Sequence, residues 1–241
     1  METEKRGTLY LIPCPIADET AVWTVLPAAN KVIMDALDYF IVENVRSARR
    51  FLSKAGVSRP IETLEFRELN EHTLAGQEVE ELIQPLLCGR SAGVISEAGV
   101  PGVADPGALV VALCHRRGIR VVPLVGPSSI LLALMASGLN GQSFAFNGYL
   151  PVKPPERLKA IRALERRART ERQSQLFIET PYRNGKLMAQ LLEGCAPDTL
   201  LTLAVNITAP DELIETHLIK EWRLRPMPPL EKRPALFIIG I

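Results

Sequence analysis

The chain has 241 residues, of which 47% are hydrophobic, and its formal net charge is +1 at pH 7. This length fits one large domain or two of ordinary size, and the apolar fraction is large enough for a buried core. The nearly neutral charge excludes a general polyanion binder, so a role in nucleic-acid binding would have to come from local basic patches.

The first half of the chain alternates short apolar runs with amphipathic segments. The apolar runs predict strands at 8–13, 38–43, 62–66, 92–96 and 119–124. The amphipathic segments predict helices at 24–37, 47–55, 77–87 and 106–117. Buried strands that alternate with helices are typical of an α/β domain with a largely parallel sheet. We place this domain at residues 1–125.

The second half contains shorter strands that are less regularly separated by helices. Its patterns predict helices at 126–138, 158–168 and 184–192, and strands at 143–150, 175–179, 200–206, 213–219 and 235–239. These features favour a second α/β domain with a mixed sheet, at residues 126–241.

Cysteine and histidine usage predicts no metal centre. The cysteines at 14, 88, 114 and 195 are scattered without a C-x-x-C pair, and the three histidines lack metal-like spacing. Free thiols fit a reducing compartment. The N-terminal segment has no apolar signal core, and no run approaches the roughly 18 apolar residues of a membrane span. We therefore expect a soluble cytoplasmic protein without a membrane partner.

A long stiff loop, SEAGVPGVADPG at 96–107, follows the predicted strand at 92–96. Ligands of open parallel sheets bind beyond the carboxyl ends of the strands, where this loop and the segments CPIADE and VGPSS are expected. Gly99 and Gly102 would let the backbone approach a ligand closely. An alternative is that Asp105 is only the N-cap of the next helix, and that Ser128 and Ser129 only cap the helix that follows them.

The segment 153–172 is locally basic, with eight cations against three carboxylates. An apolar stripe on the predicted helix indicates that the arginines face outward, where they would contact phosphates without reading sequence. The cations are Lys153, Arg157, Lys159, Arg162, Arg166, Arg167, Arg169 and Arg172. A smaller cluster comprises Arg46, Arg49, Arg50 and Lys54. The alternative for both clusters is an ordinary solvated helix face.

Several motifs together resemble a known family. They are GTLYLIPCPI (7–16), SEAGVPGVADPG (96–107), GIRVVPLVGPSS (118–129), FNGYLP (146–151) and ETPYR (179–183). The chain resembles, over nearly its whole length, the small-subunit ribosomal-RNA 2′-O-ribose cytidine methyltransferases of the tetrapyrrole methylase superfamily. The resemblance implies two α/β domains with S-adenosyl-L-methionine in the cleft between them. It also implies a homodimer that acts on ribosomal RNA or the small ribosomal subunit.

The resemblance also implies which residues form the site. The candidates for the catalytic base are Glu43, His72 and Glu97, together with Asp105. The residues implied in cofactor binding are Pro13, Cys14, Pro15, Ser96, Ala98, Gly99, Val100, Pro101, Val103, Asp105, Ser128, Ser129, Tyr182, Ala204, Asn206, Pro234 and Ala235.

This sequence departs from the family pattern mainly on the acceptor side. Ala17 and Asp18 replace a glycine and an asparagine, and Glu97 and Val100 replace an aspartate and a threonine. Asn44 stands where an acid is typical, and residues 205–209 lack a charged pair. Two alternatives therefore stay open: methylation of a tetrapyrrole-like or other small metabolite, and a non-catalytic paralogue that only binds the cofactor.

Overall fold

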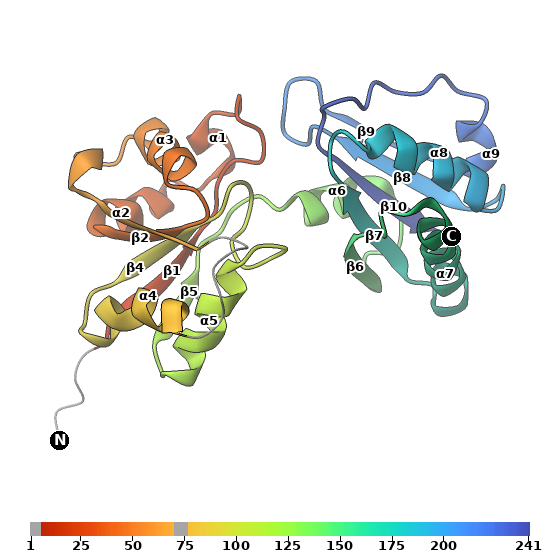
Figure 1. Ribbon diagram of the computed structural model, residues 1–241. Helices are drawn as coiled ribbons and strands as arrows, with labels where there is room; N and C mark the ends of the chain where they lie inside the picture. The colour runs from red at the N-terminus through yellow and green to blue at the C-terminus, as the bar shows by residue number, and fades with distance from the viewer. Residues whose placement is uncertain (1–5, 70–76) are drawn as a thin grey trace. The chain divides into compact units, whose positions relative to one another are not determined.

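The computed structural model of the chain describes residues 6–69 and 77–241 (Figure 1). It contains two compact units, Met1–Ser128 and Ser129–Ile241, which divide three residues after the predicted boundary at residue 125. Each unit has one five-stranded sheet. The prediction of two α/β units, the first with a parallel sheet and the second with a mixed one, is confirmed.

The sheet of unit 1 has the strand order β3-β2-β4-β1-β5, and every neighbouring pair is parallel. Its strands are β1 (Thr8–Ile12), β2 (Tyr39–Val42), β3 (Glu65–Glu68), β4 (Ala92–Ile95) and β5 (Arg120–Pro123). Its helices are α1 (Val22–Val25), α2 (Ala29–Ala36), α3 (Val45–Ala55), α4 (Gln77–Leu87) and α5 (Gly107–Arg116), with a 3-10 turn at Ile61–Thr63.

The sheet of unit 1 is buried on both faces, as parallel sheets normally are. Helices α1, α2 and α3 cover one face, and α4 and α5 cover the other (Figure 1). Successive side chains of a strand point to opposite faces, so Ile41 joins the core under α4 and α5 while Phe40 and Val42 join the core under α1 to α3. Because the helices cover the two faces of the sheet, the loops that could bind a ligand lie at the ends of its strands.

Two predicted elements of unit 1 are wrong in detail. The single helix predicted at 24–37 is broken into α1 and α2, because Pro27 disfavours the helical conformation at the residue before it. Leu26 accordingly has extended backbone angles of φ −106° and ψ 139°. The strand predicted at 62–66 begins only at Glu65, since the residues that follow Pro60 form the 3-10 turn.

The sheet of unit 2 has the order β6-β7-β10-β8-β9, with β6 and β7 parallel and the other pairs antiparallel. Its strands are β6 (Phe144–Tyr149), β7 (Ser174–Glu179), β8 (Leu200–Val205), β9 (Leu213–Leu218) and β10 (Ala235–Gly240). Its helices are α6 (Ser129–Ser137), α7 (Pro154–Glu171), α8 (Asn184–Gly194) and α9 (Ile219–Trp222).

Helices α7, α8 and α9 pack on one core of unit 2, whose strand side chains include Phe177, Leu203 and Phe237. Helix α7 is longer than predicted, because Pro154 and Pro155 occupy its first turn, where proline costs no hydrogen bond. No helix in the described part of the chain is long and apolar enough to cross a membrane.

We expect Gly93→Ala to destabilise unit 1. Gly93 lies in the central strand β4, and a Cβ atom there would come within 2.6 Å of Ile12 Cδ1 and 3.0 Å of Phe40 Cδ1. Overpacking a close-packed core costs about 1–3 kcal/mol, which a denaturant titration would detect. Gly141→Ala is the control, because nothing lies within 4 Å of its Cβ position. Equal stability of the two variants would contradict this packing.

Candidate functional site

The carboxyl ends of β1, β2 and β4 lie side by side, because β4 pairs with both β1 and β2 in parallel register. The loop after β1 begins with Pro13 and Cys14, the segment after β2 begins with Glu43, and the loop after β4 begins with Ser96. Parallel topology therefore brings together predicted site residues that are more than 80 positions apart.

A backbone hydrogen bond ties the loop after β1 to the loop after β4. Cys14 N donates to Gly99 O at 2.8 Å, and the Cys14 thiol lies 3.6 Å from Ser96 O. Gly99 has φ +68°, a left-handed conformation that favours glycine. The third predicted loop also lies here: a Cβ on Gly99 would sit 3.4 Å from Pro127 O, and one on Gly126 would lie 2.3 Å from Pro13.

Asp105 closes the loop that follows β4. Its Oδ1 accepts hydrogen bonds from Gly102 N at 2.9 Å and from Gly107 N at 2.6 Å. The prediction of Asp105 as the helix N-cap is wrong by one residue, since Pro106 is the N-cap of α5. The carboxylate still satisfies the first helical N–H, so it has a structural role and is the weaker candidate for a base.

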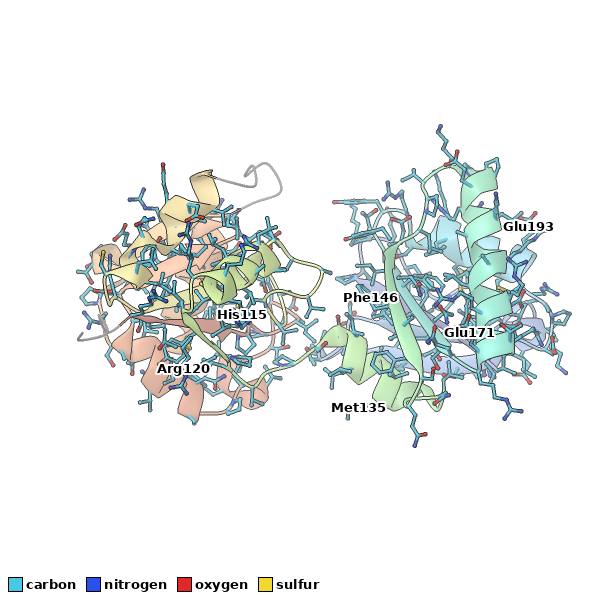
Figure 2. All side chains as sticks on the ribbon, turned by 90° about the horizontal axis from the view of Figure 1, so that it is seen from below. His115, Arg120, Met135, Phe146, Glu171 and Glu193 are labelled. Atoms are coloured by element: carbon cyan, nitrogen blue, oxygen red, sulfur yellow. The ribbon has the colours of Figure 1, made fainter. Side chains whose placement is uncertain are left out.

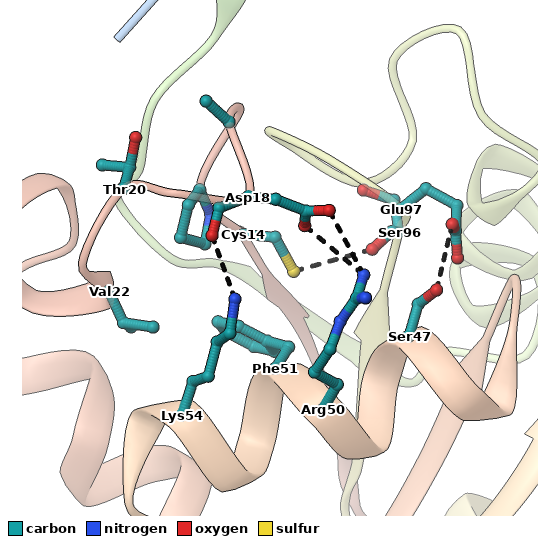
Figure 3. Close-up of a pocket in the computed structure, with 12 residues that line it drawn as sticks. Cys14, Asp18, Thr20, Val22, Ser47, Arg50, Phe51, Lys54, Ser96 and Glu97 are labelled. Atoms are coloured by element: carbon teal, nitrogen blue, oxygen red, sulfur yellow. Dashed lines mark hydrogen bonds and ion pairs between the residues drawn. The ribbon is translucent and has the colours of Figure 1, made fainter. Parts of the chain in front are cut away.

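Glu43 and Glu97, two of the predicted bases, lie at neighbouring strand ends. Glu97 N lies 3.4 Å from Glu43 Oε2, and Ser47 Oγ donates to Glu97 Oε2 at 3.1 Å (Figure 3). Ser47 is itself placed by the N-cap of α3, because Asn44 Oδ1 accepts from Ser47 N at 3.1 Å. The third predicted base, His72, lies outside the described residues.

A small pocket opens where these loops meet α3 (Figure 3). Its volume of about 40 Å³ is room for about three water molecules. Ligand sites for whole small molecules are far larger, so this pocket fits one small group. Its lining residues are Cys14, Pro15, Ala17, Asp18, Thr20, Val22, Ser47, Arg50, Phe51, Lys54, Ser96 and Glu97.

Two cations of α3 contact the loop after β1 in this pocket. Arg50 Nη2 lies 3.4 Å from Asp18 Oδ1, and Lys54 Nζ donates to Asp18 O at 3.0 Å. The sequence showed Arg50 and Lys54 only as part of a basic cluster. Their contact with Asp18 depends on tertiary packing, and no local sequence signal indicates it.

The Cys14 thiol stays protonated at neutral pH. Burial raises its pKa, and the negative charges of Glu97 and Asp105 raise it further. Burial likewise raises the pKa of Cys114 to about 11 and that of Cys195 to about 12. Cys14 therefore acts as a packing residue and hydrogen-bond donor.

Ser128 ends unit 1, and Ser129 begins α6 in unit 2. The alternative that these serines cap the helix is not observed, since neither hydroxyl makes a hydrogen bond to any residue within 6–69 or 77–241. Both residues are half-buried.

The predicted site residues of unit 2 gather at one end of its sheet. Asn206 follows β8, Pro234 precedes β10, and Asn206 N donates to Pro234 O at 3.0 Å. Ala235 pairs with the last residues of both β7 and β8. Tyr182, just after β7, is 76% exposed. Ala204 is fully buried within β8, between β10 and β9.

Backbone strain concentrates near these predicted residues. Ala104, Asn206 and Thr208 have positive φ values of 56°, 48° and 71°. Such conformations are uncommon in residues other than glycine and gather at functional sites. The described residues contain no group of three His, Cys, Asp or Glu side chains that could hold a metal ion.

Comparison with known proteins identifies the family. The family model for tetrapyrrole (corrin/porphyrin) methylases matches residues 21–222. The chain belongs to the tetrapyrrole methylase family. This match confirms the resemblance seen in the sequence motifs. The family uses S-adenosyl-L-methionine as its methyl donor.

Similar curated proteins carry the name ribosomal RNA small subunit methyltransferase I. The protein from Xylella fastidiosa is 34% identical over 77% of this chain and 63% of its own length. Those from Vibrio cholerae and Escherichia coli O157:H7 are each 31% identical, over 86% and 87% of this chain and 67% and 68% of their own lengths. The chain thus spans about two thirds of the length of these relatives.

A solved structure of the methyltransferase CobJ has the same fold. It matches with a TM-score of 0.62 and covers 97% of this chain and 94% of its own. Its sequence identity is 18%, so this likeness concerns the fold alone.

We expect iodoacetamide at pH 8 to modify Cys88 in the folded protein and to spare Cys14. Cys88 is exposed and Cys14 is buried, and only the thiolate form reacts. Mass spectrometry of tryptic peptides over time would give both rates, with the unfolded protein as the control in which both cysteines react. Equal rates in the folded protein would contradict the packing of Cys14 between the two loops.

Proposed function

We propose that this protein is an S-adenosyl-L-methionine-dependent methyltransferase that methylates a ribose 2′-hydroxyl of small-subunit ribosomal RNA. The observation that carries this proposal is the set of relatives at 31–34% identity over most of the chain, whose names specify small-subunit ribosomal RNA. The ribose 2′-hydroxyl is what the resemblance of the sequence motifs implies. The reaction would take place in the cytoplasm, where ribosomal subunits are found. The homodimer that the resemblance implies stays a prediction.

The loops of unit 1 fit the proposed cofactor. Gly99 and Gly102, at φ +68° and +81°, expose backbone that a side chain would cover. Around them Pro13, Pro15 and Pro101 hold the loops in fixed conformations, so less ordering entropy is lost when a ligand binds. When bound, the cofactor supplies a methyl group on a sulfonium to an oxygen nucleophile.

The side chains next to these loops fit the proton transfer that such a reaction needs. A ribose hydroxyl is a poor nucleophile, and a positioned base contributes about 10²–10⁴-fold in rate. Glu97 is the residue we assign as this base, with Glu43 next to it. The hydrogen bond from Ser47 Oγ fixes the orientation of the Glu97 carboxylate. Alignment of the hydroxyl with the methyl group supplies a further large part of the rate.

The surface of α7 supports a polyanionic acceptor, though through fewer residues than the sequence indicated. Arg157 does not face outward: it is 3% exposed, donates to Pro151 O and Val152 O, and lies 3.5 Å from Glu179 Oε2. Arg167 pairs with Glu171, and Arg169 pairs with Asp198. These cations are therefore neutralised within the protein.

Lys159, Arg162 and Arg166 are left on one exposed face of α7, spaced three and four residues apart. None of them makes an ion pair with a residue in the described part of the chain. They line a groove of about 320 Å³ with Pro155, Leu158 and Ala163. Figure 2 shows the side chains of α7 around this helix, with Glu171 labelled at its C-terminal end.

Transfer of a radiolabelled methyl group tests the proposed function. The purified protein is incubated with methyl-labelled S-adenosyl-L-methionine and with small ribosomal subunits from a methylation-deficient strain. We expect label in the ribosomal RNA, on a ribose 2′-oxygen that nuclease digestion and mass spectrometry identify. Label only in a small metabolite added as a competitor, or in no acceptor at all, would overturn the proposal.

We expect the triple reversal Lys159→Glu, Arg162→Glu and Arg166→Glu to weaken RNA binding more than tenfold. Loss of three phosphate contacts would also flatten the slope of log K against log salt by about 2. The control variant reverses Arg120, Lys186 and Lys220, exposed cations on three separate elements, and so has the same net charge. Equal losses in both variants would show that α7 acts only through overall charge.

We expect Gly99→Ala to weaken binding of S-adenosyl-L-methionine about tenfold. A left-handed conformation costs an L-residue roughly 1–2 kcal/mol, so the loop would shift and release the backbone hydrogen bond to Cys14. Gly138→Ala is the control, because Gly138 has φ +72° with nothing within 4 Å of its Cβ position, and it lies in unit 2. Unchanged affinity of Gly99→Ala by calorimetry would remove this loop from the cofactor site.

A further inference from the structure

The ion pair in the pocket of unit 1 is weak and open to exchange. Arg50 Nη2 lies 3.4 and 3.5 Å from the two carboxylate oxygens of Asp18 (Figure 3). The two side chains are 57% and 75% exposed. Exposed ion pairs add little net stability, because water solvates both charges well. Another anion could therefore replace Asp18 at Arg50 at little cost.

The helix that bears Arg50 has a large excess of positive charge. The 11 residues of α3, VRSARRFLSKA, contain four cations and no carboxylate. Arg46 makes no ion pair with a described residue, and Arg49 lies over the ring of Phe66. Lys54 donates a hydrogen bond to the backbone oxygen of Asp18 and makes no ion pair with a described residue. Asp18 is thus the carboxylate that pairs with Arg50, and its removal would leave the part of the pocket at Arg50 and Lys54 more positive.

The size and position of the pocket fit a phosphate. Its volume of about 40 Å³ holds one small polar group. Ser47, Arg50 and Lys54 are spaced three and four residues apart, so they share one face of α3. Ser47 holds Glu97 at one end of this row, and Arg50 lies about 5 Å further along the helix axis. A phosphate at Arg50 would therefore lie within one nucleotide of a ribose hydroxyl at Glu97.

We propose that Arg50 and Lys54 bind the phosphodiester next to the ribose that is methylated, and that Asp18 occupies this position as a competing carboxylate until RNA binds. This inference rests on the proposed function, because it needs RNA as the acceptor. Arginine binds phosphates and carboxylates most strongly through two parallel hydrogen bonds. Asp18 does not form that arrangement, because one nitrogen of Arg50, Nη2, faces both of its oxygens at 3.4 and 3.5 Å. Asp18 is then a residue that limits affinity for the acceptor.

Opposite effects of two substitutions test this inference. We expect Asp18→Asn to lower the KM for small ribosomal subunits about threefold, because the competing charge is gone. We expect Arg50→Gln to raise that KM about tenfold, because a charge-assisted contact with phosphate is lost. Fluorescence anisotropy of a labelled single-stranded RNA oligonucleotide would measure RNA affinity without catalysis. We expect it to rank the variants in the same order, with Asp18→Asn binding most tightly and Arg50→Gln least tightly.

Neighbouring residues provide matched controls. Glu19→Gln removes the same charge as Asp18→Asn from the same loop, but Glu19 has no contact with Arg50 or Lys54. Arg49→Gln removes the same charge as Arg50→Gln from the same helix, but Arg49 does not line the pocket. We expect each control to change KM by less than half as much, on a logarithmic scale, as its partner variant.

Several outcomes would overturn the inference. One is a KM that does not fall in Asp18→Asn, or that falls equally in Glu19→Gln. Another is a loss of affinity for S-adenosyl-L-methionine in Asp18→Asn, which would make Asp18 a structural residue of the loop. A third is binding of inorganic phosphate at Arg50 with RNA affinity unchanged in all variants, which would indicate a site for free anions. Failure of the wild-type protein to methylate RNA would instead overturn the proposed function, and the oligonucleotide affinities would still test Arg50 and Asp18.

Discussion

The hydrogen bond from Cys14 N to Gly99 O is the contact on which the candidate site depends. It joins the loops that leave two adjacent parallel strands, and it requires the left-handed backbone of Gly99. Parallel strands alone bring the loop origins together, but they do not fix where the loops go. This bond fixes the position of Ser96 and of the pocket that Ser96 lines. Pro127, in the segment after β5, also lies close to Gly99. The backbone of these loops thus determines where the side chains of the candidate site lie.

Charge is distributed in a way that the overall composition conceals. The chain is nearly neutral, yet α3 and one face of α7 present cations with few internal partners. The cations next to the buried carboxylate of unit 2 differ from these, because they form ion pairs within the protein. Arg157, which is buried, and Arg183, which is half-buried, both pair with Glu179, whose side chain is 1% exposed. Removing a partner of this buried carboxylate is costly because it leaves an uncompensated charge. The cations with internal partners are neutralised within unit 2, and those without an ion-pair partner among the described residues are available to an anionic partner.

The sequence was sufficient for most elements of the fold, because hydrophobic periodicity is a local property. It predicted the strands of both sheets, and Pro27 was a visible signal for the helix break that the periodicity concealed. The orientation of Arg157 was not predictable in this way, since its partner Glu179 lies 22 residues away in another element. The same reason applies to the contact between Asp18 and Arg50. Contacts of this kind depend on how loops close over a sheet, which no local pattern encodes.

The candidate site was predictable mainly through family resemblance. The motif at 96–107 identified the loop, and the structure adds the atoms that hold it, such as Asp105 with its two backbone donors. The roles of the cofactor-binding residues stay predictions, including those of Tyr182 and Asn206 in unit 2.

Calorimetric titration of the wild-type protein with S-adenosyl-L-methionine and with S-adenosyl-homocysteine tests the central claim most directly. We expect micromolar binding of at least one of the two, at one site per chain, by a protein whose folding is verified by circular dichroism. Absence of binding for both ligands would contradict the claim that the loops after β1 and β4 form a cofactor site.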